Sequence, residues 1–165
     1  MIGSASDVEA LPIPVLGTVV GGRHEPVDDA WGTVEATIEL ADGVSGDMLD
    51  GLSEFSHLEV IFVFHRVDPS AGLPVRRRPR GRDDLPEVGA LAQRHAKRRG
   101  RLGLSRCEIV GVGDRSITVR GLDAIDGTPM LDLKPWFDAF GPRGPVREPE
   151  WVSSIVASYY EPSGE

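Results

Sequence analysis

Apolar and polar residues alternate over several short stretches of the chain, a pattern typical of half-buried β-strands. Residues 32–40, GTVEATIEL, place Val, Ala, Ile and Leu on one face and Glu and Thr on the other. Residues 55–67, FSHLEVIFVFHRV, are apolar on both faces, which predicts a central strand. The remaining strands are predicted at residues 11–20, 106–112, 116–122 and 129–136.

Helical spacing occurs in three places. Residues 45–52 predict a short helix with Ser45 as N-cap, and residues 86–97 predict a short basic helix. Residues 149–160 carry an apolar stripe from Trp151 to Tyr159, which we expect to pack on the rest of the domain or on a partner chain. Residues 68–88 contain the RRRPRGR cluster and four prolines, and predict a long loop without regular elements.

Turn signals and connection lengths indicate the fold class. Gly113-Asp114 and Asp126-Gly127 predict tight turns between strands, and the chain has 20 Gly and 13 Pro. There is no β-α-β rhythm and no Gly-x-Gly-x-x-Gly after a strand. We therefore predict a mainly β (α+β) fold, a small antiparallel β-barrel with a few short peripheral helices and not a Rossmann fold. Residues 11–165 would form this single domain after a disordered N-terminus at residues 1–10.

Charge is segregated along the chain. Residues 76–106 hold eleven Lys or Arg and three Asp or Glu, which gives a local charge of +8. Because the net charge of the chain is −8, the remaining residues together carry −16. Such a block favours an anionic partner, with nucleic acid first. A solvated basic loop that binds nothing is the alternative, and charge alone does not separate the two.

Other features exclude several classes of protein and site. The single cysteine, Cys107, excludes an internal disulfide and is expected to be a small buried residue. His57 and His65 lie eight residues apart, about 26 Å along a strand, which is too far to share a metal ion. We expect no metal, and each histidine alone can be a structural residue. Neither a signal peptide nor a membrane span is indicated, which predicts a cytoplasmic protein with no membrane partner.

Three motifs in this order resemble one family: FSHL through FH at residues 55–65, AQR through LGLS at residues 92–105, and DGTPMLDLKP at residues 126–135. They resemble the TrmO-type (TsaA-like) S-adenosylmethionine-dependent tRNA methyltransferases, from about residue 13 to 134 and more weakly to 160. The resemblance implies a homodimeric β-barrel that binds S-adenosyl-L-methionine and methylates N6-threonylcarbamoyladenosine next to the tRNA anticodon. Two segments depart from the family pattern, residues 26–28 and residues 98–103.

The resemblance also implies site residues. The cofactor pocket would be lined by Pro26, Val27, Asp28, His65, Arg66, Arg94, Leu104, Asp126, Gly127, Thr128 and Pro129. Asp126 or His65 could accept the proton that leaves the acceptor amine. Arg98, Arg99 and Arg101 would contact RNA. Without the resemblance, the sequence favours an ordinary hairpin turn at Asp126-Gly127.

Three functions remain open from the sequence. The first is a tRNA methyltransferase with the acceptor that the family implies. The second is a methyltransferase with the same pocket and a small metabolite as acceptor. Residues 26–28 and 98–103 depart from the family pattern, which permits a different acceptor. The third is a non-catalytic module that binds S-adenosylmethionine or RNA.

Overall fold

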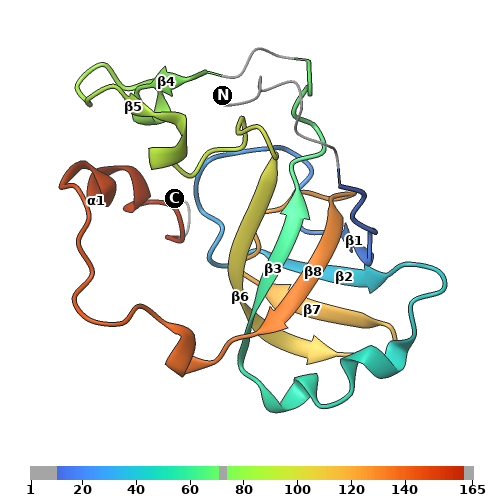
Figure 1. Ribbon diagram of the computed structural model, residues 1–165. Coiled ribbons are helices and arrows are strands. Elements are labelled where there is room, and N and C mark those ends of the chain that lie inside the picture. Colours follow the sequence, from blue (N-terminus) through green and yellow to red (C-terminus); the bar gives the residue numbers. More distant parts are fainter. Residues whose placement is uncertain (1–10, 71–73, 162–165) are drawn as a thin grey trace, which may run out of the picture.

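The computed structural model describes residues 11–70 and 74–161. Six antiparallel strands close into a barrel in the order β1-β2-β7-β6-β3-β8, as Figure 1 shows. The barrel strands are β1 (Gly17–Val20), β2 (Glu35–Leu40), β3 (His57–Val63), β6 (Leu102–Val112), β7 (Ser116–Arg120) and β8 (Pro129–Pro135). A small separate hairpin pairs β4 (Arg76–Arg77) with β5 (Val88–Gly89). The predicted antiparallel barrel is confirmed.

Alternation within each strand builds the core. In β3, Leu58, Val60 and Phe62 are fully buried, whereas Glu59, Ile61 and Val63 on the other face are half-buried. β3 pairs with β6 along one edge and with β8 along the other, as expected for a central strand. The inward side chains of the other five barrel strands complete the core, among them Val19, Ile38, Cys107, Ile117 and Met130. Cys107 is buried as expected, and burial raises the pKa of its thiol to about 12.

Strand ends differ from the prediction in two places. β1 is shorter than residues 11–20, and β6 begins at Leu102 instead of residue 106. β6 can extend this far because Gly103 leaves room for Phe62: a Cβ at residue 103 would lie 2.2 Å from the Phe62 ring. His65 lies beyond the end of β3, in a turn, and is not part of the strand.

The helices are shorter than the sequence pattern indicates. Residues 45–52 contain 3₁₀ helices at Gly46–Leu49 and Leu52–Glu54, and the Ser45 hydroxyl accepts the N–H of Asp47 at 3.3 Å as the predicted cap. Further 3₁₀ turns lie at Pro79–Gly81, Ala90–Ala92 and Asp138–Phe140. The C-terminal helix is present as α1 (Trp151–Val156). None of the helices in the described part of the chain is long and apolar enough to cross a membrane.

The basic helix predicted at residues 86–97 is wrong, because this segment forms β5 and one 3₁₀ turn. Residues 68–88 were predicted to be without regular elements, but they contain β4 and a 3₁₀ turn. Leu91, which was to lie on the apolar side of the helix, is 80% exposed, so no buried face supports a helix. The Gln93 side chain donates to the carbonyls of Arg77 (2.8 Å) and Val88 (3.4 Å), holding the hairpin. The expectation for residues 1–10 lies outside the described residues.

Gly103→Ala should destabilise the barrel by about 1–3 kcal/mol, because the added methyl meets the buried Phe62 ring in a well-packed core. The matched control is Gly111→Ala in the same strand, where a Cβ meets nothing within 4 Å. Urea unfolding of both variants measures the difference. Equal free energies of unfolding would show that Phe62 can move aside.

Candidate functional site

The Asp126-Gly127 turn lies at one end of the barrel, between β7 and β8. Gly127 has a φ of +79°, a conformation that favours glycine. One carboxylate oxygen of Asp126 accepts the N–H of Gly21 at 2.8 Å, and the N–H of Asp126 donates to the Arg23 carbonyl at 2.7 Å. The turn is therefore more than a hairpin connection, since it anchors the chain that leaves β1.

His65 lies against this turn. Its Nδ1 is 3.2 Å from the Thr128 hydroxyl, which is buried. Burial lowers the pKa of His65, the charge of Arg66 lowers it further, and the charge of Asp126 opposes both. The imidazole is therefore neutral near neutral pH and can accept a proton.

Arg66 connects the same turn to a residue that the sequence analysis did not assign to the site. Its guanidinium donates to the carbonyl of His24 at 2.9 Å, and His24 Nδ1 lies 3.5 Å from a carboxylate oxygen of Asp126. His65, Arg66 and residues 126–128 thus lie close together, linked through Thr128 and His24. Their part in a cofactor pocket stays a prediction. His24 has no local sequence signal beyond its place in a polar, proline-containing loop.

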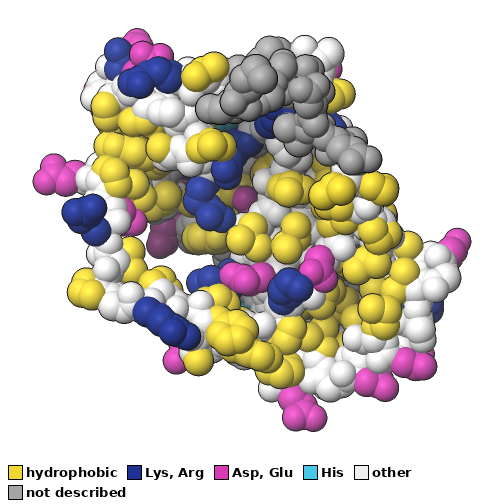
Figure 2. All heavy atoms as spheres, in the orientation of Figure 1, with side chains coloured by type: hydrophobic (Ala, Val, Ile, Leu, Met, Phe, Trp, Pro, Cys, Tyr) yellow, Lys and Arg dark blue, Asp and Glu magenta, His cyan; other side chains and the backbone are white. Residues whose placement is uncertain are grey.

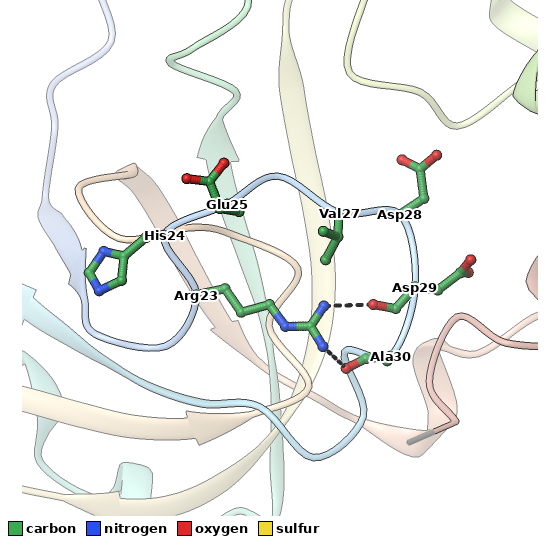
Figure 3. A pocket seen from close by; sticks show the side chains of 7 residues that line it. All are labelled: Arg23, His24, Glu25, Val27, Asp28, Asp29 and Ala30. Atoms are coloured by element: carbon green, nitrogen blue, oxygen red, sulfur yellow. Dashed lines mark hydrogen bonds between the residues drawn. The ribbon is translucent and has the colours of Figure 1, made fainter. Parts of the chain in front are cut away.

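Residues 23–30, which we call the pocket loop, border a cavity of about 620 Å³. Figure 3 shows the Arg23 side chain crossing the inside of the loop, where it donates to the carbonyls of Asp29 (2.6 Å) and Ala30 (2.5 Å). The predicted residues Val27 and Asp28 line the cavity, whereas Pro26 is exposed and does not line it. These bonds from Arg23 connect the start of the loop to its end and satisfy two of its carbonyl groups, although the loop has no regular secondary structure.

Trp31 and Arg80, which lie outside the pocket loop, support it through aromatic and ionic contacts. The Arg23 guanidinium lies 4.7 Å from the centre of the buried Trp31 ring, and the indole N–H donates to the Val27 carbonyl at 3.0 Å. Arg80 donates to both carboxylate oxygens of Asp29 at 2.7 Å each. Hydrogen bonding from Arg80 lowers the pKa of Asp29. A residue of the basic segment therefore holds the wall of the cavity.

Arg94 and Leu104 form a second pair, apart from the residues that line the cavity. The Arg94 guanidinium donates to the Leu104 carbonyl at 3.1 Å. Leu104 lies on the outer face of β6 and is exposed. Their part in a cofactor pocket stays a prediction.

A partly buried carboxylate that the sequence did not single out lies close to this pair. Asp123 accepts hydrogen bonds from the hydroxyls of Ser105 and Tyr159. Burial raises the pKa of Asp123, and the bond from Tyr159 and the charge of Arg94 lower it in part. Nothing in the local sequence distinguishes Asp123 from the other carboxylates of the chain.

Much of the basic segment bonds to its own chain. Arg76 donates to the Glu87 carbonyl (2.9 Å), Arg78 donates to the Leu85 carbonyl, and Arg82 pairs with Asp84. Among the predicted RNA-binding residues, Arg101 donates to the Val67 carbonyl at 3.3 Å, and its N–H donates to the Arg98 carbonyl at 2.9 Å. Arg99 is exposed. The positive block is thus partly a scaffold, which charge counting did not reveal.

Metal chemistry has no visible ligand set here. No group of three or more His, Cys, Asp or Glu side chains that could hold a metal ion occurs within residues 11–70 and 74–161.

Comparison with known proteins finds a family match. The model of the tRNA-methyltransferase O N-terminal domain matches residues 26–141. A probable S-adenosyl-L-methionine-binding protein of Pyrococcus abyssi is 34% identical over 150 residues, which is 83% of this chain and 76% of that protein. The tRNA (adenine(37)-N6)-methyltransferase of Escherichia coli is 37% identical over 94 residues, 54% of this chain and 40% of the enzyme.

The fold is also similar to solved structures. The crystal structure of TrmO from Pseudomonas aeruginosa superposes with a TM-score of 0.69 at 23% identity, over 86% of this chain and 62% of that one. At this identity the likeness concerns the fold. This chain spans less than two thirds of that structure and less than half of the Escherichia coli enzyme.

The pKa of His65 should respond in opposite directions to its two charged neighbours. Asp126→Asn should lower it further, because a negative charge is removed, and Arg66→Gln should raise it, because a positive charge is removed. NMR titration of the His65 ring protons measures both shifts, with the exposed His57 as internal control. Shifts of the same sign would contradict the arrangement described here.

Proposed function

Because this chain belongs to the tRNA-methyltransferase O N-terminal domain family, we propose that it is an S-adenosylmethionine-dependent methyltransferase acting on N6-threonylcarbamoyladenosine in tRNA. The observation that carries the proposal is the meeting of His65, Arg66 and residues 126–128 with the pocket loop at one end of the barrel. These residues lie far apart in the sequence, and they are the ones that the family resemblance implies.

The residues at this end fit the proposed cofactor. The open cavity bordered by residues 23–30 has a volume of about 620 Å³, within the usual range of roughly 300–1,000 Å³ for small-molecule sites. His65, Arg66 and residues 126–129 lie beside it and do not line it. Val27, Asp28, His65, Arg66 and residues 126–129 would hold the cofactor on this side, with Pro26 next to them in the loop. Arg94 would bind its carboxylate, because a guanidinium can hold a carboxylate by two parallel hydrogen bonds. Leu104, whose carbonyl Arg94 contacts, would lie against it.

When bound, S-adenosylmethionine supplies an activated methyl group on a sulfonium. The task of the protein is then mainly to align donor and acceptor, because charge is dispersed during this displacement. A turn fixed to Gly21 and Arg23 and a loop fixed by Arg23 and Arg80 support such alignment. No metal ion is part of the proposal.

Two groups are candidates for the base that takes the proton from the acceptor amine. His65 is neutral near neutral pH because its pKa is lowered, so its free nitrogen can accept a proton. Asp126 uses one oxygen to accept the Gly21 N–H, and its second oxygen faces His24. We propose His65 and Asp126 as the candidate catalytic bases. The pH profiles of activity for variants of each residue would show which one takes the proton.

tRNA is the proposed partner, with Arg98, Arg99 and Arg101 as phosphate contacts at the barrel end. A small metabolite is the second candidate acceptor, and the intramolecular bonds of Arg78, Arg80 and Arg82 favour it, because these side chains are already occupied. A non-catalytic module that binds the cofactor or RNA is the third possibility.

We propose that the protein is a homodimer and that it is located in the cytoplasm. Exposed apolar residues Leu102 and Leu104 lie on the outer face of β6, and Figure 2 shows apolar side chains gathered over β3, β6 and β8. The stripe on α1 is half-buried against its own chain, so it supports the dimer less than the sequence suggested. Light scattering distinguishes dimer from monomer.

Incubation of the protein with S-adenosylmethionine and tRNA that carries the threonylcarbamoyl modification tests the function. Mass analysis of the nucleosides should show the modified adenosine heavier by one methyl group. Binding should weaken with salt by roughly 0.9 per phosphate contact in log–log slope on duplex nucleic acid. Methylation of a metabolite and not of tRNA would favour the small metabolite as acceptor. Binding of the cofactor or tRNA without any methyl transfer would favour the non-catalytic module.

Arg94→Ala should weaken cofactor binding several-fold or more, on the scale of about 1.5–3 kcal/mol for a lost charged hydrogen bond. Arg98→Ala is the control, because we assign Arg98 to RNA: cofactor affinity should stay unchanged while tRNA binding weakens in a salt-dependent manner. Calorimetry with S-adenosylmethionine compares the two. Unchanged affinity in Arg94→Ala would remove this residue from the site.

A further inference from the structure

The C-terminal segment at residues 151–160 contacts the pocket loop and its surroundings at several points. The N–H groups of Ala30 and Trp31 donate to the carbonyls of Ser158 (3.0 Å) and Tyr159 (2.9 Å). Arg82 of the basic segment reaches the Ser154 carbonyl and hydroxyl at 3.3 Å each. Figure 1 shows a long excursion of the chain after β8, with α1 next to the β4–β5 hairpin.

Tyr159 joins this segment to Asp123 at the barrel end. Its hydroxyl donates to the partly buried carboxylate of Asp123, which also accepts the hydroxyl of Ser105 from β6. A hydrogen bond to a charged group is among the stronger ones, and leaving a partly buried charge without a partner is costly. The Tyr159 hydroxyl therefore fixes the segment to the same barrel end that carries Asp126.

The fit between the segment and the chain after the pocket loop is close. A Cβ at Gly32 would lie 1.9 Å from the carbonyl oxygen of Tyr160, so residue 32 has to be glycine for the two backbones to meet. The segment also lies beyond residue 141, where the family match ends. The backbone contact and the Tyr159 hydroxyl bond are thus two independent attachments.

We propose that Tyr159 and Asp123 are positioning residues for cofactor binding: their hydrogen bond holds residues 158–160 against residues 30–32 and so fixes the pocket loop in its binding shape. The proposal rests on the proposed function for the identity of the ligand. Neither residue is among those that line the cavity at the pocket loop. Loss of the bond lets the loop adopt other conformations. The apparent affinity for the cofactor then falls in proportion to the fraction of molecules whose loop is in the binding conformation.

Tyr159→Phe removes only the hydroxyl, and Tyr160→Phe is the matched control, because Tyr160 is half exposed and its ring packs on that of Tyr159. Hydrogen exchange without cofactor should show lower protection of the Ala30 and Trp31 amides in Tyr159→Phe, with the barrel amide of Val60 unchanged. In calorimetry, Tyr159→Phe should raise the Kd for S-adenosylmethionine at least about threefold. The turnover number at saturating cofactor should change little, and Tyr160→Phe should resemble the wild type.

Gly32→Ala and Asp123→Asn provide the second line of evidence. Gly32→Ala should reproduce the exchange and Kd changes by separating the two backbones, without touching Asp123. Asp123→Asn keeps an oxygen acceptor for Tyr159, so it should show the smaller loss. Unchanged protection of Ala30 and Trp31 in Tyr159→Phe would overturn the proposal, as would lower protection with an unchanged Kd. If the wild type binds no cofactor, the proposed function fails, and amide protection alone then decides whether Tyr159 holds the loop.

Discussion

The seam between β1 and β8 is the constraint on which the rest of the structure depends. Only two residue pairs of these strands are in register, Gly17 with Met130 and Thr18 with Pro129. The seam is lengthened by backbone bonds from Val19 to Thr128 and from Gly127 to Val19, both under 3 Å, and by the Asp126 side chain on Gly21. The turn at residues 126–128 therefore both closes the barrel and shapes the candidate site.

Strands could be predicted from the sequence wherever one face is buried, because the side-chain period of two then leaves a clear pattern, as in residues 32–40. Residues 86–97 show why the helical pattern misled: spacing was present, but Leu91 had no core to face. The meeting of His65 with Thr128 joins residues 63 positions apart, so only family resemblance could suggest it. Asp123 and the Tyr159 hydroxyl were not foreseeable, since a polar pair that forms through tertiary packing leaves no local period.

Charge counting found the basic segment but not its use. Irregular backbone leaves carbonyl groups without partners from a sheet or helix, and these need donors. An arginine carries five N–H donors. Here Arg76 and Arg78 donate to carbonyls of their own segment, and Arg101 donates to a carbonyl just before that segment. The same residue type that favours RNA binding thus also supports a loop-rich fold, and composition alone does not separate these two uses.

The order of contacts along the chain sets an order of assembly. β1 near the start pairs with β8, so the barrel cannot close until residue 130 and its neighbours are available, and such long-range pairing forms slowly. Residues 158–160, which cover the chain at residues 30–32, come later still. During synthesis from the N-terminus, residues 30–32 therefore stay without this cover until residues 158–160 have been made.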